Sequence, residues 1–463
     1  MSEARTENAR TLASLLKLSV EEAAELLDVA IIVTSDPADV AGQVLADFAA
    51  TLIGRTVSSV VRNEADASAV AELVVGEARA TRTNAIRLQV TANEIVIGGE
   101  AVTSKIAEST PGVVLLVAAC YATGVILRSA LGGRLLVSAP ALENGLLIPI
   151  SAVIGNDRSW LDQEVTLSDA YLAGAGAVGN GFVYALTTLR VRGVLVLLDS
   201  DTVSDGNLNR CVWFAESDID YPKATRLAQR AAARLTALTL VPEISTLQDF
   251  GKRQPNDRWL KTLIVAVDSR RTRRMLQHEI PQEVFDASTT GIAEIVLHHH
   301  RQHTEHACMA CIYSETADEL SREKHMADTL GITLDEVQDH FVTASTAAKI
   351  HEKYPHVAAS AIEGQAYDSL FKALCSQGTL VGGDHQQVLA PFGFVSVLAG
   401  TFLAIEVCRR AAHTEQATDW NYWRLSPWSP AVVELRQIRS KLATCEFCAN
   451  ASMQKAVRML WGS

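Results

Sequence analysis

The chain has 463 residues, of which 48% are hydrophobic, and a formal net charge of −12 at pH 7. This length predicts roughly two to four domains, and the acidic balance argues against nucleic-acid binding, which requires a basic face. No secretory leader opens the sequence, and the longest apolar run, 112–127, is shorter than a bilayer is thick. We therefore expect a soluble cytoplasmic protein with no membrane partner, whose eight cysteines are reduced.

The first 165 residues carry no recognisable motif, and their periodicity predicts an α/β domain. Alternating polar and apolar residues at 86–99 predict β structure. The apolar helix predicted at 115–133 resembles a second helix rich in small residues, predicted at 392–411. The remaining predicted elements are helices at 9–29, 40–53 and 66–79 and a strand at 31–34.

The region from Tyr171 to Lys223 carries the most informative pattern. A short apolar run leads into Gly174, Gly176 and Gly179, and an apolar helical pattern follows. A second strand ends in Asp199, about 20 residues after the last glycine, as a mononucleotide-binding βαβ unit requires. The glycines let the backbone approach a phosphate at a helix N-terminus. Because dehydrogenases and methyltransferases share this pattern, it predicts a nucleotide without identifying it.

Charged and polar residues continue beyond Asp199. The segment DSDTVSDGNLNR contains Asp201, Asn207 and Arg210, and Lys223 stands at the start of the next predicted helix. Two carboxylates, an arginine and a lysine suit a triphosphate with Mg²⁺ better than a nicotinamide.

This arrangement resembles the ThiF/MoeB adenylyltransferases and the ubiquitin-activating enzymes, whose signature is GxGxxG, then D-x-D-x-V-x-x-x-N-L-x-R, then a lysine. The family also has an aspartate after its fourth strand, which matches Asp268, whereas Cys211 stands where members often have glutamine. The resemblance implies a Rossmann-like ThiF-type α/β fold with a mainly parallel sheet, in which Arg210 and Asp268 act in catalysis. It also implies that ATP and Mg²⁺ are bound by Gly174, Gly176, Gly179, Asp199, Asp201, Asn207, Arg210, Lys223 and Asp268.

The same resemblance suggests a domain organisation. Residues 1–165 would form an N-terminal α/β domain, either a degenerate adenylation half, as in eukaryotic ubiquitin-activating enzymes, or an unrelated dimerisation or docking domain. Residues 166–313 would form the ATP-binding core and 314–387 a helical crossover insert. Residues 388–463 would supply a return helix and C-terminal strands.

Two groups of basic residues have simpler interpretations than ligand binding. The arginines at 270, 271, 273 and 274 are expected to form a solvated helix face. The histidines at 298, 299, 300, 303 and 306 have irregular spacing, which favours a solvent-facing strand end over a metal site.

Two CxxC pairs, one near the end of the predicted core and one near the C-terminus, predict a structural Zn²⁺ site. Four thiolates are a common ligand set for tetrahedral zinc, and many members of the resembled family place their two pairs in this way. Redox-active or buried free thiols are the alternative. The predicted ligands are Cys308, Cys311, Cys445 and Cys448.

A catalytic thiol is expected in the insert, where thioester-forming members of the family carry their nucleophile. Cys375 is its only cysteine and precedes a glycine-containing loop, although a buried packing role is the alternative. Cys211 is a second candidate, since Arg210 beside it would lower its pKa.

The resemblance implies ATP-dependent adenylation of the C-terminal carboxylate of a ubiquitin-like protein ending in glycine. Transfer to Cys375 and hand-over to a conjugating enzyme would follow, as in enzymes of antiviral defence clusters. The alternative is a sulfur-carrier adenylyltransferase that forms no thioester. Simple members are homodimers in which an N-terminal arginine reaches the partner's ATP, a role open to Arg5 or Arg10. An internal pseudo-dimer is the other arrangement, and a nucleotide-binding scaffold without catalysis is the least favoured function.

Overall fold

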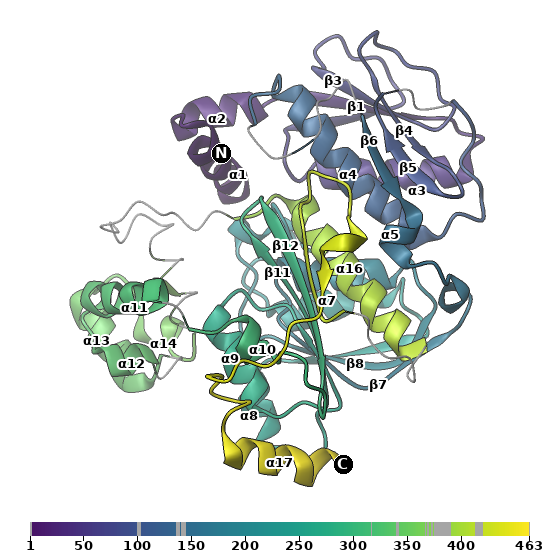
Figure 1. Ribbon diagram of the computed structural model, residues 1–463. Coiled ribbons are helices and arrows are strands. Elements are labelled where there is room, and N and C mark those ends of the chain that lie inside the picture. Colours follow the sequence, from purple (N-terminus) through teal and green to yellow (C-terminus); the bar gives the residue numbers. More distant parts are fainter. Residues whose placement is uncertain are drawn as a thin grey trace.

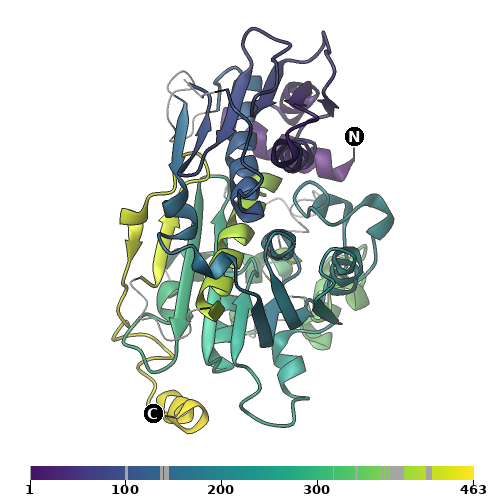
Figure 2. The same cartoon turned by 90° about the vertical axis from the view of Figure 1, so that its right-hand side faces the viewer.

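The computed structural model describes residues 2–99, 103–135, 139, 145–315, 317–338, 342–365, 367, 370–371, 374, 390–412 and 420–462. An N-terminal half with its own sheet lies above a larger core, and a group of helices, α11–α14, lies beside that core (Figure 1). In the turned view the two sheets follow one another along the long axis, with the C-terminal helix at the far end (Figure 2).

The N-terminal half is built on a six-stranded sheet of order β2-β1-β3-β4-β5-β6. Strands β2, β1, β3 and β4 run parallel, whereas β5 and β6 add to the sheet antiparallel. The elements are α1 (Glu3–Leu16), α2 (Val20–Leu27), β1 (Ala30–Ser35), α3 (Val40–Ile53), β2 (Ser59–Arg62), β3 (Ala71–Val75), β4 (Ile86–Val90), β5 (Glu94–Ile97), α4 (Gly112–Ala130), β6 (Leu146–Pro149) and α5 (Ile150–Ile154).

Two of the expected N-terminal elements were wrong. The segment 66–79 contains strand β3, which lies between β1 and β4. All five of its residues are buried, so it lacks the alternation of a half-buried strand. The helix expected at 9–29 is two helices. Lys17 adopts a left-handed φ of 60° that ends α1, and Ser19 forms a capping box with Glu22 that begins α2. The strand at 31–34, the helix at 40–53 and the β structure at 86–99 are confirmed.

The core contains an eight-stranded sheet of order β14-β13-β12-β11-β10-β7-β8-β9. The five strands from β11 to β9 are parallel, and β12, β13 and β14 are antiparallel. Its elements are β7 (Val165–Ala173), α6 (Ala177–Leu186), β8 (Val191–Leu198), α7 (Lys223–Ala232), β9 (Leu238–Glu243), α8 (Leu247–Gly251), β10 (Thr262–Val265), α9 (Arg270–His278), β11 (Glu283–Thr290), β12 (Glu294–Arg301), α10 (Met309–Ile312), α16 (Gly393–Ala412), β13 (Tyr422–Leu425), β14 (Arg436–Gln437) and α17 (Ala451–Trp461).

The two sheets have the same topology. Strands β1 to β6 correspond in order and direction to β7, β8, β10, β11, β12 and β13. Helix α3 follows β1 as α6 follows β7, and the apolar helices α4 and α16 each stand before the last corresponding strand. Helix α4 packs against α3 and α16 against α6, and α4 also contacts α16. The two halves therefore repeat one architecture and meet through equivalent helices.

Helix α4 is the one described helix that is long and apolar enough to cross a membrane. Its residues from 113 to 127 are all buried within the protein. It is therefore the core helix of the N-terminal half.

The helical insert has its own small core and is attached to α9 by buried ion pairs. It consists of α11 (Ala317–Leu330), α12 (Leu334–Gln338), α13 (Ala344–Lys353) and α14 (Ala359–Ile362). Arg274 donates two hydrogen bonds to Glu319, at 2.7 and 3.0 Å, and Arg271 pairs with Glu323. Arg273 pairs with Asp286 at 2.8 Å. The expectation that these arginines form a solvated face was therefore wrong.

The histidines of β12 are not at a solvent-facing strand end either. His298, His299 and His300 are buried, because β12 lies between β11 and β13. His299 pairs with Glu283 at 2.9 Å. Burial lowers the pKa of His298 to about 4, so this imidazole is neutral at pH 7. The aromatic residues Trp420, Tyr422, Trp423 and Trp428 are likewise buried on and beside β13.

Candidate nucleotide and metal sites

Two of the three predicted glycines are required by the tight turn between β7 and α6. Gly174 has a φ of +99°, and a Cβ there would lie 2.8 Å from the Ala266 carbonyl oxygen. A Cβ on Gly179 would lie 2.1 Å from the carbonyl oxygen of Gly174. Gly176 caps α6, and a Cβ on it would meet no atom within 4 Å. The unpaired N–H groups of α6 are thus open to an anion.

Asp199, at the end of β8, braces this turn. Its carboxylate accepts hydrogen bonds from the backbone N–H of Ala175 at 2.7 Å and of Asp201 at 2.9 Å. Burial raises its pKa to about 6, although the nearby Lys223 opposes the rise.

Lys223 lies at the start of α7 and is held close to both aspartates. Its ammonium group pairs with Asp201 at 2.8 Å, and its backbone N–H donates to the Asp201 carbonyl at 2.9 Å. Burial lowers the pKa of Lys223, but the charges of Asp199 and Asp201 outweigh it and raise the pKa. The lysine is therefore cationic.

The loop after β8 presents Arg210. Asn207 accepts a hydrogen bond from the Ser204 backbone at 3.1 Å, which shapes the loop. Arg210 Nη1 donates to the carbonyl of Gly206 at 2.7 Å and to Asn209 Oδ1 at 2.8 Å. Its Nε and Nη2 have no partner among the described residues. One nitrogen of this guanidinium is thus fixed, and the other two are left to bind an anion.

The predicted residues converge on one edge of the core sheet. Gly174 and Asp199 directly follow the neighbouring strands β7 and β8, and the exposed Asp268 follows β10, on the other side of β7. The thiol of Cys211 lies among them, close enough to feel the charges of Arg210 and Lys223. Burial nevertheless raises the pKa of Cys211, and only 1% of this residue is exposed. The prediction of an activated thiol at Cys211 was therefore wrong, and Cys375 lies outside the described residues.

Asn180, which the sequence pattern did not indicate, joins the glycine turn to the loop that carries Arg210. This fully buried amide donates to the carbonyls of Ala175 and Gly176, at 2.8 and 3.1 Å. Its oxygen accepts from the Trp213 backbone N–H at 3.2 Å. An asparagine in the otherwise apolar first turns of α6 was the one feature that could have indicated it.

The equivalent position in the N-terminal half is closed. The segment between β1 and α3 has no glycine, and Asp39 caps α3. Its buried carboxylate accepts from the backbone N–H of Gly42 at 2.8 Å and of Ile106 at 3.1 Å. A carboxylate of the protein therefore occupies the helix N-terminus that α6 leaves open.

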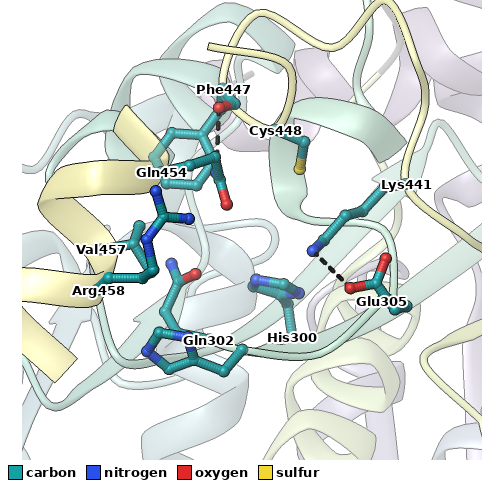
Figure 3. A pocket seen from close by; sticks show the side chains of 10 residues that line it. His300, Gln302, Glu305, Lys441, Phe447, Cys448, Gln454, Val457 and Arg458 are labelled. Carbon is teal, nitrogen blue, oxygen red and sulfur yellow. Dashed lines mark hydrogen bonds and ion pairs between the residues drawn. The ribbon is translucent and has the colours of Figure 1, made fainter. Parts of the chain in front are cut away.

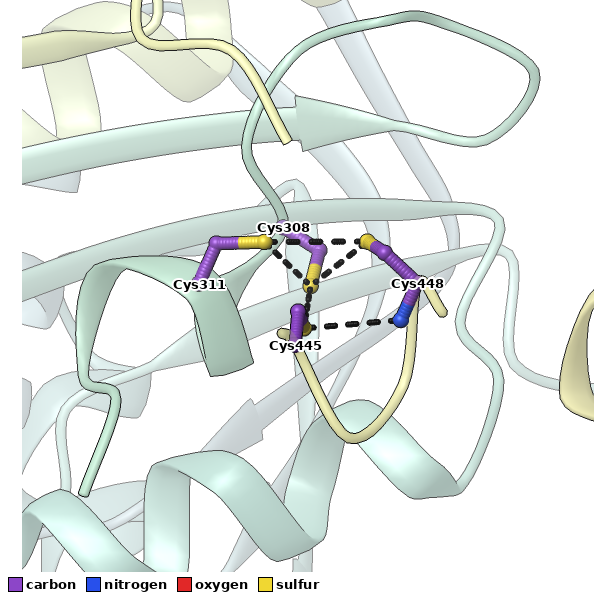
Figure 4. Close-up of side chains that lie close together, drawn as sticks. All are labelled: Cys308, Cys311, Cys445 and Cys448. Carbon is purple, nitrogen blue, oxygen red and sulfur yellow. Dashed lines mark hydrogen bonds between the residues drawn. The ribbon is translucent and has the colours of Figure 1, made fainter. Parts of the chain in front are cut away.

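The four predicted zinc ligands form one cluster. Their sulfur atoms point toward a common centre (Figure 4) and lie within 4.8 Å of one another. Cys308 Sγ is 3.7 Å from Cys311 and Cys445 and 3.3 Å from Cys448. Tetrahedral zinc with Zn–S bonds of about 2.3 Å requires sulfur separations near 3.8 Å, so the cluster fits this metal. These separations are too long for a disulfide.

A cavity of about 200 Å³ lies beside this cluster. Lys441 and Arg458 lie on opposite sides of it, and Lys441 pairs with Glu305 at 3.4 Å (Figure 3). His300, at the end of β12 that pairs with the start of β11, also lines it. The cavity therefore lies at the amino ends of the parallel strands, whereas the glycine turn lies at their carboxyl ends.

Comparisons with known proteins agree with this architecture. The model of the ThiF family matches residues 154–447, and that of the E1 N-terminal domain matches residues 1–140. The uncharacterized protein y4jF of Sinorhizobium fredii is 26% identical over 277 residues, which cover 55% of this chain and 51% of that protein. The match thus spans about half the length of this curated relative.

Solved structures of E. coli MccB are also similar. The complex with ATP is 14% identical with a TM-score of 0.37, covering 79% of this chain and 98% of that one. The complex with MccA-N7isoASN is 14% identical with a TM-score of 0.38, covering 77% and 95%.

Proposed function

Because this chain belongs to the ThiF family, we propose that it adenylates the C-terminal carboxylate of a ubiquitin-like protein with ATP. Family membership supports an adenylyltransferase-like activity. One observation carries the proposal for this chain: an open helix N-terminus, an arginine with two free nitrogens and a largely buried lysine lie together at the carboxyl ends of the core strands. Three positive groups at one place suit the charge of a triphosphate.

Each residue has a role in this proposal. The N–H groups of α6 and the side chains of Arg210 and Lys223 bind the phosphates, and Asp199 accepts from the ribose hydroxyls. Asp201 and Asp268 would hold Mg²⁺, which supplies additional charge stabilisation when bound. A carboxylate oxygen of the carrier attacks the α-phosphorus, the bond to the bridging oxygen breaks, and pyrophosphate leaves with its electron pair. The protein contributes orientation and charge stabilisation to this step.

The N-terminal half favours a ubiquitin-like carrier over a sulfur carrier. It repeats the strand order of the core, its helix N-terminus is closed by Asp39, and it matches the E1 N-terminal domain. A degenerate adenylation half joined to an active one fits a ubiquitin-activating enzyme, which would carry the acyl group as a thioester on Cys375 for a conjugating enzyme. A minimal sulfur-carrier adenylyltransferase needs only the core.

The Cys₄ cluster is proposed to hold a structural Zn²⁺. Its four thiolates complete the coordination, so no position is left for a substrate. The metal would tie the end of the core to the C-terminal segment. The described cysteines form no disulfide, which is consistent with a cytoplasmic location.

The test is incubation with ATP, Mg²⁺ and a ubiquitin-like protein encoded beside this chain, followed by a non-reducing gel and a pyrophosphate-exchange assay. We expect carrier-dependent exchange and an adduct that thiols remove. Cys375→Ala should lose the adduct but keep exchange, whereas Cys120→Ala, a change of a cysteine buried in α4, should keep both. Exchange without any adduct would favour the sulfur-carrier function, and no exchange with any carrier would refute adenylation.

A further inference from the structure

We propose that Asn8, in the N-terminal half, is a positioning residue for Arg210 in the core. The inference rests on the proposed function, because it assigns Arg210 to the phosphates of ATP. It gives the N-terminal half a direct part in the active site of the same chain.

A relay of two buried amides connects the residues. Asn8 Oδ1 accepts from Asn209 Nδ2 at 3.0 Å, and Asn209 Oδ1 accepts from Arg210 Nη1 at 2.8 Å. Asn8 Nδ2 in turn donates to the Arg55 carbonyl at 2.7 Å. Only 3% of Asn8 and 2% of Asn209 is exposed, so water cannot readily replace either bond. Each amide turns its oxygen toward Arg210, and the relay therefore fixes which way both amides face.

Further contacts hold the N-terminal half on the same loop. The first N–H groups of α1, at Glu3 and Ala4, donate to Asp205 at 2.8 and 3.4 Å. Arg55, near the end of α3, donates to three loop carbonyls: Leu208 at 2.6 Å, Val212 at 2.8 Å and Phe214 at 3.0 Å. The backbone around Arg210 is thus fixed by two elements outside the core.

The relay should affect how Nε and Nη2 of Arg210 bind a phosphate of ATP. An arginine side chain loses considerable rotamer freedom when it binds a phosphate, and fixing Nη1 in advance reduces that loss. Removal of Asn8 leaves Asn209 free to turn and Arg210 free to reorient. The affinity for phosphate should fall, while that for the nucleoside should not.

The experiment measures binding of Mg²⁺ with a non-hydrolysable ATP analogue, and of adenosine, by calorimetry. Asn8→Ala should weaken binding of the analogue about 10-fold, as expected for a charge-assisted hydrogen bond. The affinity for adenosine should stay unchanged. In an Arg210→Ala background the same change should have no further effect. Thr11→Val is the matched control. It removes a partly buried hydrogen bond of 2.9 Å from α1 to the Ala390 carbonyl and should leave both affinities unchanged.

The outcomes are distinguishable. Failure of the unaltered protein to bind the analogue overturns the proposed function and this inference with it. Normal binding that Asn8→Ala does not alter, or equal losses for the analogue and adenosine, overturns the positioning role alone. An additive loss in the Arg210→Ala background does the same. Should Asn8→Ala not fold, Asn209→Ala breaks the relay from the other side, and its affinities for the analogue and for adenosine are measured in the same way.

Discussion

At the scale of single residues, the environment of Asp199 decides how the site titrates. This carboxylate sits in a buried turn, where desolvation disfavours its charge, and its pKa is raised to about 6. At pH values between the ordinary pKa of an aspartate and about 6, the folded protein binds more protons than the unfolded chain. The contribution of Asp199 to stability therefore falls as pH rises through this window. In the proposed role of Asp199 at the ribose, nucleoside binding should have the opposite pH dependence, since the ionised carboxylate is the better acceptor for ribose hydroxyls.

We therefore predict that the affinity for adenosine falls about 10-fold between pH 7 and pH 5, because roughly one tenth of Asp199 stays ionised one pH unit below its pKa. Adenosine is the right ligand because it lacks the titrating phosphates of ATP. A titration followed by NMR or calorimetry at both pH values measures the change. The Asp199→Asn variant should bind adenosine weakly, with the same affinity at pH 7 and pH 5. Constant affinity of the unaltered protein would contradict the assignment of Asp199 to the ribose.

The sequence was sufficient to predict that certain residues of one local motif lie together. Gly174, Gly179, Asp199 and Arg210 all belong to one short motif, and the structure brings them to one edge of the sheet. Asn8 could not be predicted in the same way, because its partner Asn209 is 201 residues away. The ion pair of Arg274 with Glu319 crosses 45 residues, so the arginine appeared as part of a solvated face.

At the scale of elements, the comparison of α3 with α6 explains why only one half has an open helix N-terminus. Both helices follow the equivalent strand of their sheet, but α6 begins at a glycine and α3 at a buried aspartate. An anion is favoured at a helix N-terminus, and in α3 the anion belongs to the protein itself. The wrong prediction at 66–79 also belongs to this scale, since a strand buried on both faces has no alternation that could distinguish it from a helix.

The stability of the C-terminal helix α17 should depend on the proposed metal at the Cys₄ cluster. It begins at Ala451, directly after the second CxxC pair, and the two pairs are 137 residues apart in the sequence. We predict about one zinc per chain by metal analysis, and tryptic cleavage at Lys455 and Arg458 after chelation, because metal binding supplies much of the folding energy of such sites.

The variant Cys445→Ala should be cleaved in the same way without a chelator. Cys120→Ala, which changes a thiol far from the cluster, should keep its zinc and its resistance to trypsin. Purified protein without zinc, or an unchanged cleavage pattern after zinc is removed, would show that the cysteines pack without a metal.

At the scale of the whole molecule, the chain contains two copies of one architecture and only one of them is open. The copies meet through α4 and α16, and α1 and Arg55 reach from the closed copy onto the arginine loop of the open one. The closed copy thus contacts the loop that carries Arg210 within the same chain. The sequence hinted at this through its two similar apolar helices, but the matching strand order depends on pairings that periodicity does not reveal.

This arrangement predicts a monomer with one nucleotide site. Sedimentation over a hundredfold range of concentration should give a single species near 49.9 kDa, since the helices that join the halves are already buried within the chain. Calorimetry with the ATP analogue should give one site per chain, because Asp39 closes the second copy. Asp199→Asn serves as the control and should keep the mass while losing affinity. A stable dimer, or two sites per chain, would contradict the assignment of the N-terminal half as an internal, inactive partner.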